Sequence, residues 1–253
     1  MRQTGIFYGI GVGPGDPELM TLKAVRKIRE CEIIVLPISD RELTEPMLLE
    51  QNGKENKALR YLEVCTAYQI AVQAVPEIEK KQILFLPMPM IKDKKVLRKI
   101  HAKGAETIGQ FLEQGYSIAF LTIGDPTVYS TCMYVEQMIE QQGYPVGTVS
   151  GIPSFCAAAA RLNQPLGEQE EQIHILPGSY EAGEGLQLSG TKILMKTGKK
   201  MGQIKEFLQE SSQDICLVEN CGMDRERIVR SVEEVSEDMG YYSLLIVKDK
   251  KKQ

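Results

Sequence analysis

A glycine- and proline-rich segment near the N-terminus places the strictest limit on the fold. Residues 7–12 have the apolar and aromatic character of a β-strand, and the segment Gly9-Ile10-Gly11-Val12-Gly13-Pro14-Gly15-Asp16-Pro17 continues past its end. Because glycine has no Cβ, backbone at such a strand end can approach a ligand closely. Four alternating glycines and two prolines exceed what a plain strand-to-helix connection needs. The segment predicts a ligand-facing loop in an α/β protein.

The glycine spacing opposes the two best-known nucleotide-binding loops. If Gly11 and Gly13 are the first two glycines of a dinucleotide fingerprint, Asp16 occupies the position of the third. Pro37 stands where an acidic ribose ligand is expected after the next strand. A phosphate-binding P-loop also fails, since no Gly-Lys-Ser/Thr follows. A nucleotide-dependent oxidoreductase is therefore an alternative that the spacing disfavours.

Short apolar runs alternate with helical patterns along the chain. Strands are expected at residues 7–12, 33–36, 83–86, 117–123, 146–149, 174–176, 192–195, 215–218 and 241–247. Helices are expected from Thr21 through Leu22, Val25 and Ile28, and at residues 55–75, 93–114, 129–142, 156–162 and 200–209. Pro37 is expected to end the second strand. Because the second half is richer in strands, the sequence predicts an α/β protein with a parallel-sheet domain over 1–126 and a mixed α+β domain over 127–253.

Two further loops follow apolar strands. One contains Gly124-Asp125-Pro126, and the other contains Ser150-Gly151-Ile152-Pro153. The carboxyl ends of parallel strands lie at one edge of a sheet, where ligands bind. The three loops are therefore expected to converge on one site.

Composition and charge limit the compartment and the partners. The net charge is -4, which provides no global attraction to nucleic acid or to an anionic membrane. No apolar stretch reaches the roughly 18 residues of a membrane span, and the N-terminus lacks a signal-peptide pattern. The six cysteines form no Cys-x-x-Cys pair and lie far from both histidines in sequence, so no metal site is expected. Reduced, core-forming cysteines in an intracellular enzyme favour the cytoplasm.

Five ordered segments carry a family resemblance that covers nearly the whole chain. They read GIGVGPGDPELMTLKAV, FLTIGDPTVYST, VSGIPSFCAAAARLNQPL, ILMKTGKK and LVENCG. In order, they resemble the motifs of the tetrapyrrole methylases. Within that family, the N-terminal segment, the YST after GDP and the SFCAAAARLNQPL segment look most like methyltransferases that act on C-20 of precorrin-2 or cobalt-factor II. The resemblance implies two α/β domains, S-adenosylmethionine in a cleft between them, and a homodimer.

The resemblance also implies residues that bind the cofactor. They are Pro14, Ile123, Gly124, Asp125, Val128, Pro153, Ser154, Met195, Asn220 and Cys221. This chain has Glu-Asn-Cys-Gly where many relatives have Glu-Asn-Gly, so Asn220 and Cys221 can be out of register by one residue. Most contacts are expected from backbone groups, which accounts for the abundance of glycine and proline.

The implied chemistry asks little of the side chains. The sulfonium of S-adenosylmethionine is already activated, so methyl transfer requires mainly close and aligned positioning. Asp125 and Tyr129 are candidate bases for removing the proton of the methylated carbon. His174 is more simply a core or strand-edge residue. The substrate is rich in carboxylates, which makes Arg161, Lys196 and Lys199 candidate binding residues. Each of these cations has solvation as its competing interpretation.

Several alternatives stay open at this point. The same family chemistry could methylate another position or another tetrapyrrole, such as precorrin-4 or uroporphyrinogen III. A tetrapyrrole-binding protein without turnover would share the same loops. Within the family, ribosomal RNA methylases and diphthine synthases use the same cofactor cleft, but RNA calls for a basic face that the net charge does not favour. Whether the substrate carries cobalt is not encoded in these motifs.

Overall fold

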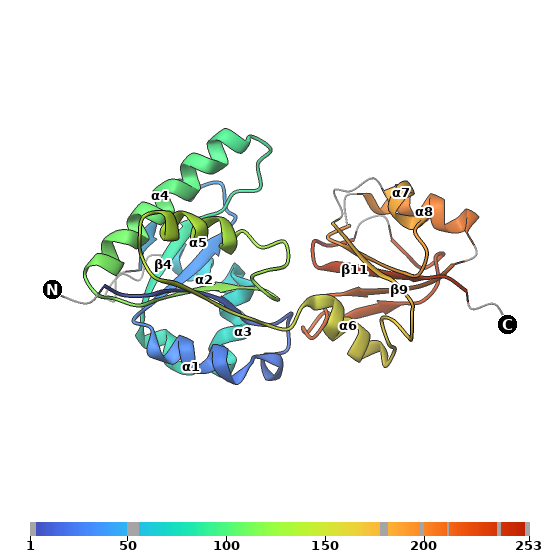
Figure 1. Ribbon diagram of the computed structural model, residues 1–253, viewed down its shortest axis with the longest axis horizontal. Coiled ribbons are helices and arrows are strands. Elements are labelled where there is room, and N and C mark those ends of the chain that lie inside the picture. The colour runs from blue at the N-terminus through green and yellow to red at the C-terminus, as the bar shows by residue number, and fades with distance from the viewer. Residues whose placement is uncertain are drawn as a thin grey trace. The chain divides into compact units, whose positions relative to one another are not determined.

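The computed structural model describes residues 4–49, 56–177, 182–197, 200–211, 213–236 and 239–250. The chain separates into two compact units, Met1–Pro153 and Ser154–Gln253 (Figure 1). The expected boundary after residue 126 is replaced by this one. The reason is that the last strand before Pro153, over Val146–Val149, pairs with the first strand of the chain and completes its sheet.

The first unit is a six-stranded sheet with helices on both faces. In chain order its elements are β1 (Phe7–Gly11), η1 (Pro17–Leu19), α1 (Leu22–Glu30), β2 (Ile33–Ile38), β3 (Met47–Leu48), α2 (Asn56–Val64), α3 (Thr66–Ala74), η2 (Pro76–Lys80), β4 (Gln82–Pro87), α4 (Lys94–Glu113), β5 (Ile118–Thr122), α5 (Cys132–Gln141) and β6 (Val146–Val149). The strand order is β3-β4-β2-β5-β1-β6. Only the short β3 is antiparallel to its neighbour, so the carboxyl ends of the other five strands lie at one edge.

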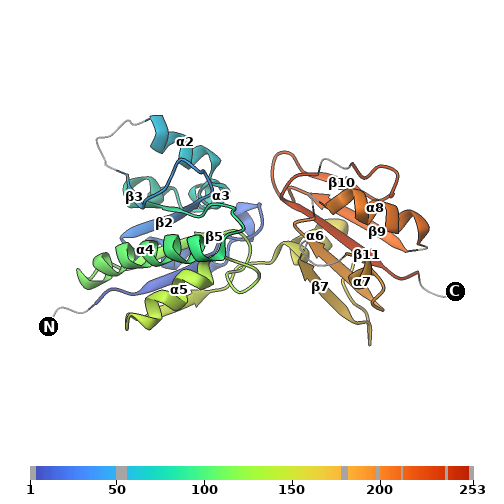
Figure 2. The same cartoon turned by 90° about the horizontal axis from the view of Figure 1, so that it is seen from above.

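Two apolar layers hold this sheet. On one face, Ala119 and Leu121 pack into a cluster with residues of α1, α2 and α3. On the other face, Ile118 and Phe120 pack with residues of α4 and α5. Figure 1 shows α4 and α5 together on one side of the sheet and α1 on the other, and Figure 2 shows α4 beside α5. Because both faces of β5 are covered, its sequence is continuously apolar instead of alternating.

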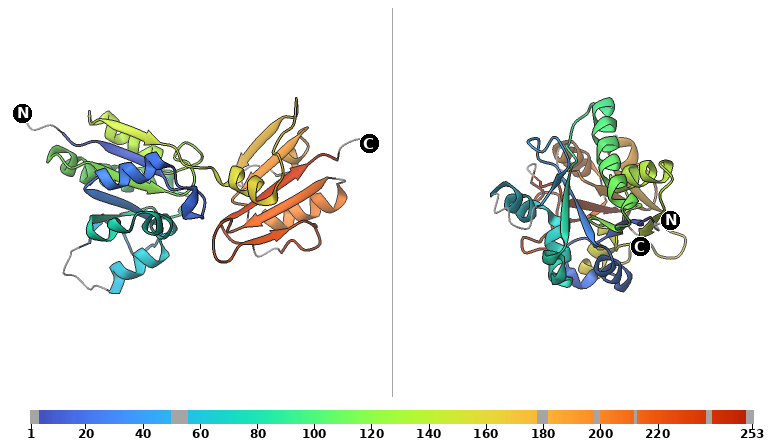
Figure 3. Two further views of the ribbon diagram at one scale, coloured as in Figure 1. Left: turned by 90° about the horizontal axis from the view of Figure 1, so that it is seen from below. Right: turned by 90° about the vertical axis from the view of Figure 1, so that its left-hand side faces the viewer.

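The second unit is a five-stranded mixed sheet, which confirms the expected change of texture. Its elements are α6 (Ser154–Leu162), β7 (Ile173–Pro177), α7 (Ala182–Leu186), β8 (Thr191–Met195), α8 (Met201–Glu210), β9 (Asp214–Glu219), β10 (Arg227–Val229) and β11 (Ser243–Lys248). The strand order is β10-β9-β11-β8-β7, and only β7 and β8 are paired in parallel. Leu194, Leu217 and Leu245 pack on one face with residues of α8. Figure 3 shows this second unit, in yellow to red, from two further directions.

Several local predictions need correction. Pro37 does not end β2, which continues to Ile38. Proline is tolerated there because β2 pairs with β5 only as far as Val35, so one side of the strand is no longer paired where the N–H is missing. The helix expected over 55–75 is two helices separated at Cys65. Leu22, expected on the apolar face of α1, is 89% exposed. The short elements β3, β10, α7, η1 and η2 were not expected, since two to five residues carry too little periodicity to detect.

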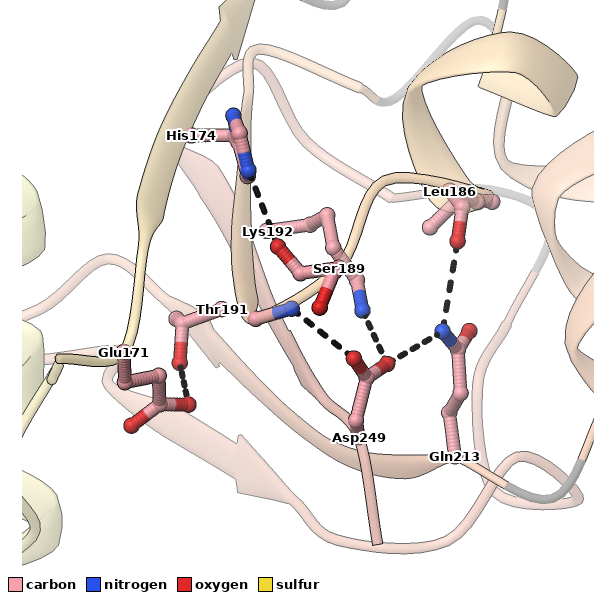
Figure 4. A network of polar contacts seen from close by, with 9 residues as sticks. Glu171, His174, Leu186, Ser189, Thr191, Lys192, Gln213 and Asp249 are labelled. Atoms are coloured by element: carbon pink, nitrogen blue, oxygen red, sulfur yellow. Dashed lines mark hydrogen bonds and ion pairs between the residues drawn. The ribbon is translucent and has the colours of Figure 1, made fainter. Parts of the chain in front are cut away.

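A buried lysine on β8 of the second sheet pairs with an aspartate that directly follows β11 (Figure 4). The side chain of Lys192, on β8, is completely buried, and its Nζ donates to Asp249 Oδ1 at 2.5 Å. Asp249 also accepts from the backbone N–H of Gly190 and from Gln213 Nε2. His174 lies beside this network on the edge strand β7 and contacts the carbonyl of Ser189 at 2.9 Å. The strand-edge interpretation of His174 is therefore confirmed.

His101 is a buried histidine that makes folding pH-dependent. It lies on α4, is 7% exposed and stacks on Tyr134 of α5, and within the described residues its Nε2 has no hydrogen-bond partner. Burial lowers the pKa of His101 below its ordinary 6.5. The unfolded chain therefore binds a proton before the folded chain does, so stability falls as the pH drops below about 6.5.

We expect His101→Phe to reduce this loss, because phenylalanine keeps the stacked ring and cannot be protonated. Denaturant midpoints at about pH 7.5 and about pH 5.5 should differ less in the variant than in the unmodified protein. His174→Gln, at the other histidine of the chain, is the control and should keep the unmodified pH dependence. An equal dependence in His101→Phe would contradict the assignment.

Candidate active site

Two of the three expected loops are joined by a pair of glycines. Gly13 follows β1 and Gly124 follows β5, and both have left-handed φ angles, of 78° and 71°. The N–H of Gly124 donates to the carbonyl of Gly13 at 2.8 Å, and the N–H of Gly13 donates to the carbonyl of Gly124 at 3.4 Å. A side chain would strain both positions, which explains why glycine occupies them. The first and second loops thus form one backbone surface.

The third loop packs against the other two through backbone alone. A Cβ on Gly151 would lie 2.1 Å from the carbonyl oxygen of Gly124 and 2.8 Å from the carbonyl carbon of Gly11. A Cβ on Gly11 would lie 2.6 Å from the nitrogen of Gly151. These approaches are possible only without side chains. The predicted convergence of the three loops is present inside the first unit.

Asp125 holds the junction together. Its side chain is buried, and Oδ2 accepts from the N–H of Gly151 at 3.1 Å. Its other oxygen accepts from the N–H of Thr127 at 2.8 Å and from the Thr127 hydroxyl at 2.5 Å. Both carboxylate oxygens are therefore used to position the second and third loops. These bonds account for the burial of Asp125 without a catalytic role, and its role as a base stays a prediction.

A cap links α1 to the same junction. The Thr21 side chain accepts from the N–H of Ala24, as expected for an N-cap, and donates to the carbonyl of Ser150 at 3.3 Å. Asp16 caps η1 by accepting from the N–H of Glu18. Pro14, which precedes both caps, is buried. The hydrogen bonds of Asp16 and Thr21 thus help to fix the first loop, which pre-organises the surface.

One side of the junction is open. A Cβ on Gly124 would meet only the carbonyl oxygen of Ile152, at 4.0 Å. Ile123, just before Gly124, and Val128, four residues after it, are partly exposed. Tyr129 has a left-handed φ of 49° and an exposed side chain, and this conformation delays the start of α5 to Cys132 instead of the expected residue 129. Pro153 closes the third loop and Ser154 begins α6.

The predicted residues of the second unit gather at one edge of its sheet. β8 and β9 both pair antiparallel to β11, so their carboxyl ends lie at the same edge. Met195 ends β8 and is buried, and Lys196 follows it with a left-handed φ of 61° and an ammonium 5.4 Å from the centroid of the Tyr241 ring. Asn220 follows β9 with a φ of 51°, next to the partly exposed Cys221. The backbone N–H of Lys196 donates to the carbonyl of Ser243, the first residue of β11, and the N–H of Asn220 donates to the carbonyl of Tyr242 just before it. These two bonds fix both turns.

Arg161 and Lys199 are the other two residues predicted to bind the substrate. Arg161, at the end of α6, donates from Nε to Glu226 at 2.5 Å, and Glu226 also accepts from the N–H of Gly222. Arg161 therefore braces the turn after β9, and its contact with substrate stays a prediction. Lys199 lies outside the described residues.

The cysteines give no sign of nucleophilic or metal chemistry. Cys31, Cys65, Cys132 and Cys216 are buried as expected, whereas Cys156 is exposed, which the sequence did not predict. Burial raises the pKa of Cys31 to about 12 and that of Cys65 to about 11, so neither is a thiolate near neutral pH. In the part of the chain that the structure describes, no three acidic, histidine or cysteine side chains form a metal-binding group. None of the described helices is both long and apolar enough to span a membrane.

The model of one protein family, the tetrapyrrole (corrin/porphyrin) methylases, matches residues 7–235. This chain belongs to that family. It is 33% identical over 244 residues to the probable cobalt-precorrin-2 C(20)-methyltransferase of Methanocaldococcus jannaschii, a match that covers 95% of each chain. It is 25% identical to the precorrin-2 C(20)-methyltransferase of a Sinorhizobium species, with 96% of this chain and 95% of the relative covered. The resemblance noted from the motifs is confirmed.

Solved structures agree on the fold of this tetrapyrrole methylase. A cobalt precorrin-4 methyltransferase aligns with a TM-score of 0.67 at 15% identity, covering 96% of this chain and 94% of the other. The uroporphyrin-III C-methyltransferase of Thermus thermophilus, complexed with S-adenyl homocysteine, aligns with a TM-score of 0.64 at 19% identity, covering 97% and 98%. The α/β fold class is thereby confirmed.

Sequence reasoning missed three residues that shape the junction. Gly11 and Gly151 were seen as members of glycine-rich loops but not as contact points, and Thr127 was not singled out at all. The glycines at two strand ends were a usable signal, since side chains are excluded where backbones meet. The hydrogen bond from Gly151 to Asp125 joins residues 26 positions apart, and no local pattern shows it.

Proposed function

We propose that this methylase transfers a methyl group from S-adenosylmethionine to C-20 of precorrin-2 or cobalt-factor II, in cobalamin biosynthesis. The similarity to the cobalt-precorrin-2 enzyme of M. jannaschii over 95% of both chains carries the proposal. The precorrin-2 and cobalt-precorrin-2 methyltransferases of a Sinorhizobium species and Salmonella typhimurium, at 25% and 24% identity, support the same reaction.

The glycine junction fits a cofactor held by backbone groups. Its open side at Gly124 leaves room where a Cβ would otherwise project, and the partly exposed Ile123 and Val128 offer apolar contact. We infer that Pro14, Gly124 and the residues beside them hold S-adenosylmethionine, while Asp125 fixes the loops. When bound, the cofactor supplies an electrophilic methyl group. The roles expected for Pro153, Ser154, Met195, Asn220 and Cys221 belong to the same proposal.

We propose that the enzyme is a homodimer and that it works in the cytoplasm. Light scattering on the purified protein tests the first, and localisation of the protein in its source cell tests the second. The substrate roles of Lys196 and Lys199 are likewise proposed, with the carboxylates of the macrocycle as their partners.

An anaerobic assay tests the reaction. Precorrin-2, cobalt-factor II and uroporphyrinogen III would be supplied in parallel with isotopically labelled cofactor, and the position of the new methyl would be found by NMR. We expect label at C-20 of precorrin-2 or its cobalt form. Methylation of uroporphyrinogen III alone would favour the alternative to which the Bacillus subtilis relative points, at 25% identity over 83% of this chain. Binding of all three without transfer would favour a non-catalytic protein.

Gly124→Val should weaken cofactor binding. The new side chain would project from the open side of the junction, and the left-handed φ of 71° adds strain of about 1–2 kcal/mol. Calorimetric titration with S-adenosylhomocysteine should show an affinity at least about tenfold lower, because part of the cofactor volume is blocked.

Gly143→Val is the matched control for this variant. Gly143 follows α5, has a φ of 89° and has nothing within 4 Å of the position of a Cβ. The same strain is therefore introduced at the opposite edge of the sheet, and cofactor affinity should not change. If both variants bind equally well, the open side of Gly124 is not part of the cofactor site.

A further inference from the structure

The start of α4 carries a dense group of cations. We define residues 92–99 as the basic segment; its cations are Lys92, Lys94, Lys95, Arg98 and Lys99. All five side chains are exposed. Across the described residues, no acidic group forms an ion pair with any of them, whereas Lys103 of the same helix pairs with Glu45. The positive charge of the segment is therefore available to a ligand.

The single acid of the segment does not cancel this charge. Asp93 is the N-cap of α4, and its Oδ1 accepts from the N–H groups of Lys95 and Val96 at 2.9 and 3.1 Å. Its carboxylate is thus directed at the backbone of the first helical turn. In a protein with a net charge of -4, five cations against one acid over eight residues form a marked local concentration of positive charge.

The basic segment lies at the same edge of the sheet as the glycine junction. It follows the carboxyl end of β4, while the junction is built at the carboxyl ends of β1, β5 and β6. The strand order β4-β2-β5-β1 separates β4 from β5 by two strand spacings and from β1 by three. With neighbouring strands about 4.8 Å apart, these separations are about 10 and about 14 Å. A macrocycle with carboxylate arms can reach across such a distance.

Exposed apolar side chains accompany the cations. Met90, just before the basic segment, is 64% exposed, and Val96 within it is also exposed. Met88, two residues earlier, instead packs in the core under α4 and α5, so the chain turns from core to surface between the two methionines. A surface with both apolar and cationic groups suits a flat conjugated ring that carries carboxylates at its rim.

We propose that the basic segment binds the carboxylate arms of the tetrapyrrole substrate, with Lys94 and Arg98 as the contacting cations. This inference rests on the proposed function. Lys94 and Arg98 are one helical turn apart and share the side of α4 that carries His101, which is buried against the molecule. Lys95 and Lys99 each lie one residue further along, about 100° around the helix and turned away from the side of His101. Arg98 can also form a paired hydrogen bond with one carboxylate.

A binding titration tests the inference directly. The probe is uroporphyrin III, a non-reacting octacarboxylic porphyrin, followed by fluorescence in the presence of S-adenosylhomocysteine. We expect Lys94→Gln/Arg98→Gln to raise the Kd by about tenfold at low salt and to flatten its salt dependence. The matched control, Lys95→Gln/Lys99→Gln, removes the same charge from the same helix and should change the Kd by less than about twofold. Mesoporphyrin, with only two carboxylates, should be affected much less than uroporphyrin.

The outcomes separate this inference from the proposed function. An unchanged Kd in Lys94→Gln/Arg98→Gln, with S-adenosylhomocysteine affinity retained in calorimetry, would overturn the inference, as would an equal loss in both double variants. In Lys94→Gln/Arg98→Gln, the KM for the tetrapyrrole that receives the methyl group should rise in parallel with the Kd, while kcat stays near the value of the unmodified protein. If no C-20 methylation occurs but uroporphyrin binding still depends on Lys94 and Arg98, the proposed reaction fails and the binding surface stands.

Discussion

Replacement of Gly151 by alanine should greatly weaken cofactor binding and destabilise the first unit. The new Cβ would lie 2.1 Å from the carbonyl oxygen of Gly124 and 2.8 Å from the carbonyl carbon of Gly11. Both neighbours are backbone atoms, so no flexible side chain can move aside. The third loop must shift, and the bond from its N–H to Asp125 would be lost with it.

The expected energies are large for a single methyl group. Overpacking typically costs about 1–3 kcal/mol, and loss of a hydrogen bond to a buried carboxylate adds about 1.5–3 kcal/mol. We therefore expect a loss of about 3 kcal/mol or more in the free energy of unfolding. If a similar energy is needed to restore the loops on binding, the affinity for S-adenosylhomocysteine falls by about a hundredfold. Thermal unfolding and calorimetric titration measure the two quantities.

Gly143→Ala separates close approach from loss of a glycine as such. It introduces a Cβ at a left-handed φ of 89° with nothing within 4 Å, so only strain of about 1–2 kcal/mol is expected and binding should be retained. Asp125→Asn is a second test, since the amide cannot accept from Gly151 and Thr127 through two carboxylate oxygens. Full cofactor affinity in Gly151→Ala would show that the junction does not form the binding surface.

The arrangement of the strands was predictable because both faces of the first sheet are covered. Continuous apolar runs, such as residues 33–36, are expected when both faces of a strand are covered, and they located β2, β4 and β5 within one or two residues. The convergence of the three loops followed from the same logic, since parallel strands that end together bring their loops together. The glycines of those loops then pointed to a backbone surface.

What escaped prediction depends on contacts between distant residues. Leu22 is apolar and begins a helix, yet its side chain faces outward, and only the packing of α1 on the sheet determines this. Asp125 reads as part of a turn, although its second oxygen holds a loop that follows 26 residues later. The basic segment reads as a solvated helix start until the topology places it at the edge occupied by the glycine junction. In each case the residue type was visible in the sequence and its neighbour was not.

The network around Lys192 is another pairing of distant residues, and breaking it should have a large effect on the second unit. Lys192 was expected only as part of a strand, yet its side chain is completely buried and pairs with Asp249, 57 residues further along (Figure 4). Asp249→Ala would leave a buried ammonium without its counter-charge and would remove the acceptor for Gly190 and Gln213. Breaking a buried pair in this way costs about 3–5 kcal/mol. Because the Asp249 side chain is 44% exposed, water moderates the loss, and we expect about 3 kcal/mol.

Lys192→Met should lower the free energy of unfolding by less than Asp249→Ala does, because it removes the buried charge together with the cost of desolvating it. Asp249 would keep Gly190, Gln213 and water as partners, so a loss of about 1 kcal/mol is expected. Lys248→Met makes the same replacement on the neighbouring strand β11, where the ion pair with Glu171 is longer, at 3.7 Å, and should cost less than about 1 kcal/mol. Denaturant unfolding, with hydrogen exchange of β8 and β11 to report on the second unit, measures all three.

The pH dependence of stability gives an independent test of the pair formed by Lys192 and Asp249. Burial alone would raise the pKa of Asp249, but hydrogen bonds from Lys192, Gly190 and Gln213 together lower it below the ordinary 3.8. A carboxyl with a lowered pKa contributes stability that is present above about 3.8 and is lost as the pH falls through the folded value. Asp249→Ala should therefore lose less stability than the unmodified protein between about pH 5 and pH 2. Two results together would contradict this assignment: equal stability of Asp249→Ala and Lys248→Met, and an unchanged acid dependence in Asp249→Ala. The buried pair would then contribute no more than a surface contact, and the stability of the second sheet would have to come from its apolar face.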